Sequence, residues 1–324
     1  MQENTQVGGE AVAPLPPTAK KKKPTSKLKR REHWTALAFI SVKYVGLIIF
    51  TALPVAFALM YSLSDYYAVR ETEPFLSRFP DLFCGFSNYK RLFTDLTYKS
   101  YFVTSILNNL IFMFSVPIGI LIGLIIAVML SKEDVIKGSR VFRMLIYIPV
   151  VSSAVAMNII WRYIFDNQYG IFNQIFHTNI YWLTDRNWLR FAIIIKSAWG
   201  SIGRTMILCL AALTNVGKDY YEAAELDGAG EFTKFFRISV PLISPTMFYL
   251  FTTGFISNLQ SYTDSQVFAQ GHPGAQTIVY FIWNSGIRES MYGIGSAASV
   301  ILTLGILVIT LVQFKVQNKW VYSE

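Results

Sequence analysis

Residue types that carry catalysis or bind metals are scarce in this 324-residue chain, which has three histidines and two cysteines. His33, His177 and His272 fall in a predicted tail and predicted loops, and no Ser/His/Asp set or carboxylate cluster accompanies them. Cys84 and Cys209 fall on opposite sides of a predicted bilayer, so they cannot form a disulfide. The sequence therefore predicts no catalytic residue, no metal site and no enzymatic activity.

The chain also lacks the Gly-x-x-x-x-Gly-Lys-Ser/Thr phosphate loop, so it cannot be an ATPase by itself. Its net charge of +9 is not accompanied by an aromatic or other nucleic-acid-binding pattern. The basic run Lys20–Lys23 is better suited to anionic membrane lipid. We expect no nucleic-acid partner.

Long uncharged hydrophobic runs dominate the rest of the sequence, in which 53% of all residues are hydrophobic. A helix needs ~20 apolar residues to cross ~30 Å of hydrocarbon. Five such runs contain no Asp, Glu, Lys or Arg, and a sixth is interrupted by Lys196 and Arg204, which require a protein-lined or aqueous face. We predict an all-α membrane protein with six transmembrane helices, at about residues 38–63, 101–130, 143–165, 188–213, 240–263 and 291–315.

Lysine and arginine are concentrated at the N-terminal end and in alternate loops between these spans. Because cytoplasmic loops carry the excess of basic residues, this bias predicts that both termini are cytoplasmic. Residues 1–33 have no apolar periodicity and are predicted to be a flexible basic cytoplasmic tail, followed by a transmembrane domain at 34–324. Outside the spans we expect short helices at 86–93 and 171–176, and a segment at 264–288 that lies against the bundle without crossing.

The longest inner loop, residues 214–240, has its own pattern. Asp219–Leu226 favours a helix, Gly228 and Gly230 permit a sharp bend, and Phe232–Val240 forms a second amphipathic segment. Pro241 fits the first turn of the following span. The pattern predicts a helix–turn–helix knob whose apolar side chains stay exposed unless a protein partner covers them.

The knob also carries a specific motif: Glu-Ala-Ala, three residues, Gly, nine residues, then Ile-x-Leu-Pro. This chain has Glu222-Ala223-Ala224, Gly228, Ile238 and Pro241 at these positions, with Val240 in place of Leu. It thereby resembles the membrane-spanning subunits of binding-protein-dependent ABC importers, in the carbohydrate branch that includes the maltose and glycerol-phosphate permeases. The likeness runs from about Leu37 to the C-terminus.

The resemblance implies a type I ABC importer permease fold in a bacterial inner membrane. It also implies a second, non-identical permease subunit, two ATP-binding subunits that hold ATP and Mg, and an extracytoplasmic solute-binding protein; this chain itself would bind no cofactor. The knob would dock on an ATP-binding subunit. The implied ATPase-coupling residues are Glu222, Ala223, Ala224, Asp227, Gly228, Ala229, Phe232, Phe236, Ile238 and Pro241.

Several spans contain polar side chains that would face each other or a pathway. Asn108 and Asn109 are expected to join helices, and Pro149 with Ser152 and Ser153 should loosen the third span. Sugars bind to aromatic faces and hydrogen-bonding groups. The predicted substrate pathway comprises Asn158, Trp161, Arg162, Tyr163, Lys196, Trp199, Tyr249, Asn258, Gln260, Tyr262 and Asp264.

Arg162 and Lys196 are the informative members of this set, because cations within spans are costly. The uncharged spans hold no acidic residue to pair with them, which favours an acidic oligosaccharide of the uronate or alginate type. Alternatively, these side chains reach the interface or pair with the sister subunit, and the substrate is a neutral oligosaccharide or a glycerol-phosphate type of solute.

Two other classes of protein remain open at this stage. An ion-coupled secondary sugar transporter would need no ATP-binding partner, but it gives no reason for the knob. A receptor or assembly protein would bind without transporting. Substrate-stimulated ATP hydrolysis by a co-purified complex separates both classes from an ABC importer.

Overall fold

The computed structural model describes residues 26–67, 73–131 and 138–322, which are helical apart from turns, connecting loops and an isolated bridge between Ser64 and Phe83. The chain forms two compact units, Met1–Val55 and Ala56–Glu324. Most of the predicted tail, residues 1–25, lies outside the described residues.

The first unit contains α1 (Ser26–Leu47), a π-helical turn at Ile48–Ala52 and the beginning of α2 (Leu53–Ser62). Helix α1 begins at Ser26, inside the stretch that the sequence assigns to the tail. The reason is local composition: residues 26–33 are rich in Lys, Arg, Leu and Glu, which favour helix.

The second unit continues with α3 (Phe75–Leu82) and α4 (Ser87–Thr94), and α4 confirms the short helix expected near residues 86–93. Asn88 of α4 is fully buried, and its amide donates to the carbonyl oxygens of Ser62 and Ser64. These hydrogen bonds fix α4 to the end of α2. They satisfy backbone groups that would otherwise be buried without partners.

Helices α5 (Leu96–Phe112) and α6 (Ser115–Ser131) form one long stretch with a break at Met113 and Phe114. Pro117 lies in the first turn of α6, where its missing N–H is tolerated. The break precedes Pro117 by three to four positions.

The third predicted span, 143–165, is sharply bent. It consists of α7 (Ser139–Val151) and α8 (Ala154–Ile164), whose axes differ by 104°. Ser152 and Ser153 have extended ψ angles of 152° and 129°, which end one helix before the other begins. The expected loosening at these serines is confirmed. Helix α9 (Ile171–Phe176) follows, with the bounds expected from sequence.

Helix α10 (Arg186–Thr214) packs closely along α6. The contact depends on Gly119 and Gly123, one turn apart on α6. A Cβ at Gly119 would lie 2.8 Å from the carbonyl oxygen of Ala198, and one at Gly123 would lie 2.7 Å from Cβ of Thr205. Small residues at four-residue spacing let two membrane helices approach in this way.

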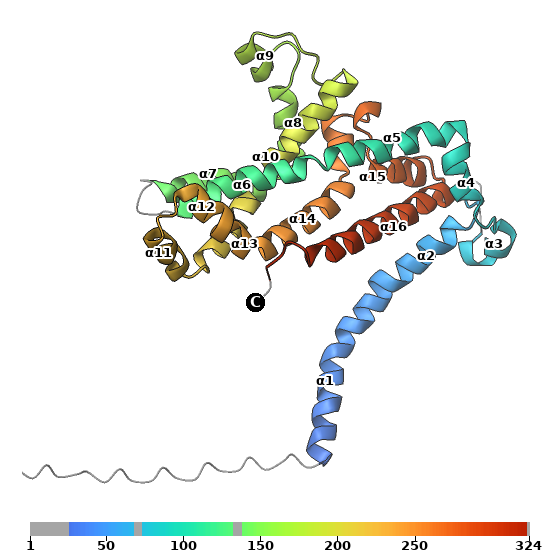
Figure 1. Cartoon of the computed structure of the whole chain (residues 1–324). Helices are drawn as coiled ribbons and strands as arrows, with labels where there is room; N and C mark the ends of the chain where they lie inside the picture. The colour runs from blue at the N-terminus through green and yellow to red at the C-terminus, as the bar shows by residue number, and fades with distance from the viewer. Residues whose placement is uncertain (1–25, 68–72, 132–137, 323–324) are drawn as a thin grey trace, which may run out of the picture. The chain divides into compact units, whose positions relative to one another are not determined.

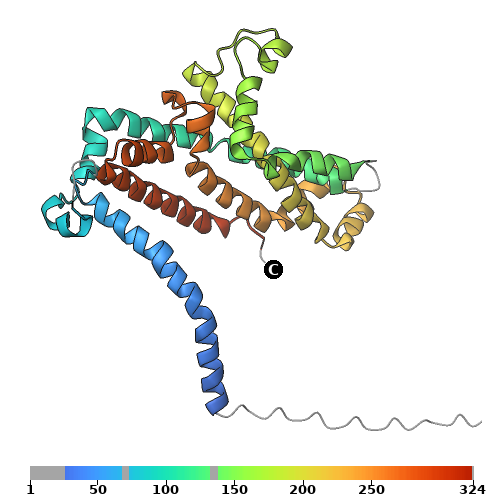
Figure 2. The ribbon, with the colours of Figure 1, turned by 180° about the vertical axis from the view of Figure 1, so that it is seen from behind.

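The knob is built from α11 (Lys218–Leu226), α12 (Glu231–Lys234) and a π-helical turn at Phe235–Ser239. Short helix α13 (Val240–Leu242) then meets α14 (Ser244–Leu259) at a 66° bend. Figure 1 and Figure 2 show α11, α12 and α13 together at one end of this unit, while α8 and α9 extend from another side.

The segment after α14 folds back onto the bundle, as predicted for 264–288. It contains a π-helical turn at Asp264–Phe268, a 3-10 turn at Pro273–Ala275, α15 (Ile278–Ile282) and a π-helical turn at Trp283–Arg288. Helix α15 packs against α5 and against the last helix, α16 (Tyr292–Gln317). His272, which the sequence places in a turn, accepts the N–H of Gly274 through Nδ1.

Four described helical stretches are long and apolar enough to cross a membrane: Trp34–Ser62, Leu96–Ser131, Arg186–Thr214 and Tyr292–Gln317. The bent pairs α7–α8 and α12–α14 bring the number to six if each pair counts as one span. Cys84 and Cys209 are both free thiols, as expected.

Asn108 and Asn109 join helices, as the sequence predicts, and both are fully buried. The amide of Asn108 donates to the carbonyl oxygens of Pro273 and Gln276. Asn109 accepts the backbone N–H of Ile278 at 2.8 Å and donates to the carbonyl oxygen of Asn258. The pair thus ties α5 to the end of α14 and to the middle of the returning segment.

Replacing Asn109 by leucine should lower the free energy of unfolding by about 1–3 kcal/mol, because the N–H of Ile278 would be buried without an acceptor. Thermal unfolding of the detergent-solubilised protein measures the loss. Asn187→Leu is the control, since that side chain is exposed in the first turn of α10. Equal stability of the two variants would contradict this role of Asn109.

Candidate functional site

A cavity of about 460 Å³ lies between α6, α8, α10 and α14. Such a volume is in the range of small-molecule sites. The cavity brings together six of the predicted pathway residues, Asn158, Trp161, Lys196, Trp199, Asn258 and Asp264. These six residues come from three different spans and from the turn after α14, so their grouping is a property of the tertiary fold.

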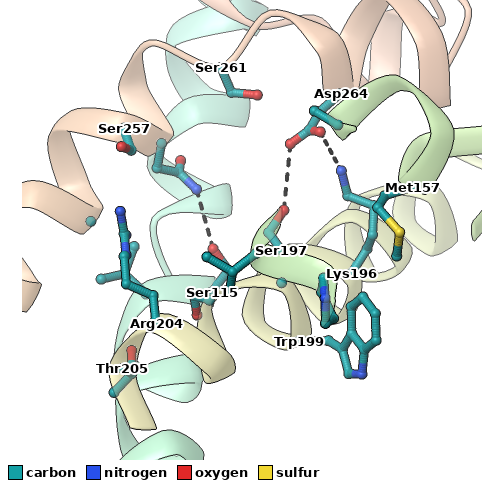
Figure 3. Close-up of a pocket in the computed structure, with 18 of the residues that line it drawn as sticks. Ser115, Met157, Lys196, Ser197, Trp199, Arg204, Thr205, Ser257, Ser261 and Asp264 are labelled. Atoms are coloured by element: carbon teal, nitrogen blue, oxygen red, sulfur yellow. Dashed lines mark hydrogen bonds and ion pairs between the residues drawn. The ribbon is translucent and has the colours of Figure 1, made fainter. Parts of the chain in front are cut away.

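Lys196 is the best-satisfied charge in this cavity. Its ammonium group forms an ion pair with Asp264 and donates to Oδ1 of Asn158 at 2.7 Å. The two ionised side chains are only 10% and 16% exposed. Figure 3 shows Lys196 and the neighbouring Ser197 of α10 both directed at the Asp264 carboxylate.

This ion pair corrects the sequence-based argument for an acidic substrate. An acidic substrate was predicted because the uncharged spans contain no acidic residue that could pair with Lys196. Asp264 lies immediately after the fifth predicted span, 240–263. It begins a π-helical turn that places its carboxylate next to Lys196 of α10. Lys196 therefore has its counter-ion within the chain.

Arg162 is also satisfied by the protein, and it lies outside the cavity. Its guanidinium donates to the carbonyl oxygen of Phe268 at 2.9 Å. It lines a second cavity, of about 490 Å³, together with Ile159, Tyr163, Asp166, Leu183, Gln266, Val267 and Gln270. The backbone N–H groups of Tyr169 and Gln168 donate to the carboxylate of Asp166 and lower its pKa, so this group stays ionised.

The remaining predicted pathway residues do not meet in the first cavity. Tyr163 lines the second cavity, Tyr249 is 56% exposed, and Gln260 follows the end of α14 as an exposed residue. Tyr262 packs against the rings of Tyr280 and Trp283. Their inclusion rested on residue type alone, which does not determine the direction of a side chain.

The first cavity is also lined by a set of hydroxyl groups that were not predicted from the sequence. Ser197, Ser201 and Thr205 follow one another at four-residue spacing on α10. Ser257 of α14 and Ser261, which lies just beyond the end of α14 at Leu259, also line the cavity. The four-residue spacing on α10 places its three hydroxyl groups on one face of that helix. This periodicity was visible in the sequence and would have identified that face of α10.

Two buried polar atoms among the lining residues have no hydrogen-bond partner in the described structure, Nε1 of Trp161 and Oδ1 of Asn258. The first is a donor and the second an acceptor. Among the described residues no three His, Cys, Asp or Glu side chains are grouped so that they could hold a metal ion.

The knob has the geometry that its motif predicts. Gly228 has φ of +74°, and its N–H donates to the carbonyl of Glu225 while the N–H of Ala229 donates to that of Ala224. These two hydrogen bonds define a Schellman motif, the standard helix end that uses glycine in the left-handed region. Helix α11 therefore ends at Leu226, before the chain turns into α12.

Lys234 holds the two helices of the knob together. Its ammonium group donates to Oε1 of Glu225 and to Oε1 of Glu231, both at 2.7 Å. The hydrogen bond to Glu225 and then that to Glu231 raise the pKa of Lys234 above its ordinary value of 10.5. A lysine whose pKa is raised by folding stabilises the folded state fully at any pH below its unfolded-state pKa. This stabilisation is lost as the pH rises through the folded-state pKa. The two ion pairs of Lys234 are therefore intact at neutral pH.

The surface of the knob carries large apolar side chains. Leu226 is 90% exposed, Phe232 82% and Phe236 63%. Glu222, Ala223, Asp227 and Gly228 are also exposed, whereas Ala224, Ala229, Ile238 and Pro241 are partly buried. Three large apolar side chains on one small projection indicate a protein-binding surface.

The long apolar helices, the cavity between them and the projecting knob are features of a helical membrane protein. A chain of a bacterial alginate ABC transporter, crystallised in complex with an alginate pentasaccharide-bound periplasmic protein, has a similar fold. The TM-score is 0.73 at 20% identity, with 90% of this chain and 96% of that chain covered.

The family model for the binding-protein-dependent transport system inner membrane component matches residues 96–321. The chain therefore belongs to this family, which confirms the resemblance seen in the motif.

Curated relatives agree with this assignment. The chain is 28% identical over 310 residues to the probable ABC transporter permease protein YesP of Bacillus subtilis, covering 91% of this chain and 94% of that protein. It is 32% identical over 244 residues to the lactose transport system permease protein LacF of Rhizobium radiobacter, covering 72% and 80%. It is 28% identical over 300 residues to the sn-glycerol-3-phosphate transport system permease protein UgpA of Salmonella typhimurium, covering 90% and 97%. These relatives are transport permeases, not enzymes.

Proposed function

We propose that this chain is a membrane-spanning subunit of an ATP-driven importer for an oligosaccharide. The knob couples ATP hydrolysis by partner subunits to movement of the spans around the cavity. In this proposal the chain crosses a bacterial inner membrane six times, with both termini in the cytoplasm. Each bent helix pair then counts as one span.

The assembly that we propose contains a second, non-identical permease subunit and two ATP-binding subunits that bind ATP and Mg. An extracytoplasmic solute-binding protein delivers the sugar. Membership of the binding-protein-dependent family supports the last partner. The names of the relatives, which transport lactose or arabinooligosaccharides, support a sugar substrate.

The coupling role is supported by the exposure of three apolar side chains on the knob, Leu226, Phe232 and Phe236. The hydrogen bond from Lys234 to Glu225 holds the two helices of the knob together. An ATP-binding subunit that covers these side chains would gain their burial energy. Closure of the ATP-binding subunits would then move the knob, and α13 connects the knob directly to α14, which lines the cavity. An ion-coupled transporter would leave the same apolar surface uncovered.

Replacing Phe232 by serine should weaken binding of the ATP-binding subunits about 10-fold or more, because burying a phenylalanine side chain contributes about 1.5–3 kcal/mol. The measurement is the amount of ATP-binding subunit retained on the affinity-tagged permease complex. Uptake driven by ATP should fall in parallel.

Phe176→Ser is the matched control, since Phe176 is 63% exposed on α9, away from the knob. It should leave retention unchanged. If Phe232→Ser retained the ATP-binding subunits as well as the control does, the proposed docking surface would be wrong.

A further inference from the structure

The cavity between α6, α8, α10 and α14 carries an excess of one positive charge. Its lining contains two cations, Lys196 and Arg204, and one acid, Asp264. Lys196 and Asp264 neutralise each other through their ion pair. The remaining charge therefore belongs to Arg204.

Arg204 differs from Arg162 and Arg190 in making no hydrogen bond or ion pair with any described residue. Arg162 donates to the carbonyl of Phe268, and Arg190 donates to Oδ1 of Asn108 at 2.6 Å and 2.9 Å. Among the described residues Arg204 makes no hydrogen bond and no ion pair, and its side chain is exposed to the cavity. A cation within a span is costly unless it serves an anion or a water-filled path.

The surroundings of Arg204 suit a hydroxylated anion. Figure 3 shows its side chain extending from α10 toward Ser257 of α14. Ser201 and Thr205 of α10 line the same cavity. A guanidinium group binds a carboxylate or phosphate through two parallel hydrogen bonds. Serine and threonine hydroxyls both donate to and accept from sugar hydroxyls.

We propose that Arg204 is the residue of this cavity that determines specificity, and that it binds the carboxylate or phosphate group of a polyhydroxylated solute during import. This inference rests on the proposed import function and names its class of substrate. It assigns the recognition of charge to Arg204 in place of Lys196 and Arg162, whose partners lie within the chain.

The test measures solute binding to the purified, reconstituted complex without its solute-binding protein. Any preference among the solutes then comes from the permease cavity. The probes are trigalacturonate, the neutral trisaccharide obtained by reducing its carboxyl groups, and glycerol 3-phosphate. The native complex should bind at least one of the two anions about 10-fold or more tightly than the neutral trisaccharide. Comparison of the two anions decides between carboxylate and phosphate.

Arg204→Gln should abolish this preference, and Arg204→Lys should retain part of it, because the charge persists without the planar pair of donors. Arg140→Gln is the control: Arg140 is exposed in the first turn of α7 and is not among the lining residues. It removes the same charge and should leave the preference intact.

The inference is overturned if the native complex binds the neutral trisaccharide as tightly as both anions, or if Arg204→Gln keeps the full preference. ATP-dependent uptake of neutral oligosaccharides in the same vesicles would then leave the proposed import function standing. Absence of ATP-dependent uptake for every probe would reject both.

Discussion

Replacing Gly228 by valine is expected to reduce ATP-coupled uptake about 5- to 30-fold while the chain still reaches the membrane. Gly228 has φ of +74°, and a β-branched residue at such an angle is strained by about 1–2 kcal/mol. A Cβ there would meet nothing within 4 Å, so the strain lies in the backbone and not in packing. The strain lowers the equilibrium constant for forming the correctly turned knob by a corresponding factor, and we expect ATP-coupled uptake to follow it.

Two control variants separate the backbone from the added bulk. Gly228→Asn adds a side chain but tolerates the left-handed region, so it should keep most of the uptake. Gly230→Val adds the same side chain where φ is −71° and ψ is 166°, which valine readily adopts. If Gly228→Val behaved like Gly230→Val in ATP-dependent uptake, the turn geometry would not be essential for coupling.

Breaking the ion pair between Lys196 and Asp264 is expected to have the largest effect on stability. Asp264→Asn leaves an ammonium group that is only 10% exposed without its counter-ion. Removing one partner of a buried pair typically costs about 3–5 kcal/mol. Because the pair faces a cavity, we expect a value near the lower end, measured by unfolding of the detergent-solubilised complex.

The double variant Lys196→Met with Asp264→Asn should be more stable than Asp264→Asn alone, since it removes both charges. The exposed pair Arg78–Asp81 provides the control, because its side chains are 38% and 67% exposed. Asp81→Asn should change stability by about 1 kcal/mol or less. Additive losses at Lys196 and Asp264 would show that the two residues do not act as a pair.

The structure of the knob could be predicted from the sequence, whereas the grouping of residues around the cavity could be predicted only in part. The first helix, the glycine turn and the second helix of the knob all lie within one predicted loop, residues 214–240. Within such a short segment, local helix propensity and helix capping determine the structure. The short helix at Ile171–Phe176 was predicted for the same reason. The bend at Ser152 and Ser153 also follows from local sequence.

The positions of charged side chains in the bundle were harder to predict. Lys196 and Asp264 are far apart in sequence and meet only because the chain turns back after α14. When each span is considered separately, Lys196 has no acidic partner. The prediction of an acidic substrate depended on that missing partner. Arg204 appeared only as an interruption of a hydrophobic run, although it is the cation that the folded cavity leaves free of protein partners among the described residues.

By itself, the sequence determined that this is a helical membrane protein with an exposed, glycine-turned knob, because run length, charge bias and local backbone preferences are properties of contiguous residues. Only the tertiary structure decided which polar groups share a cavity and which charges cancel. Those outcomes depend on how distant helices pack and where the chain returns, and ion pairing acts over a few ångströms in space whatever the separation along the chain.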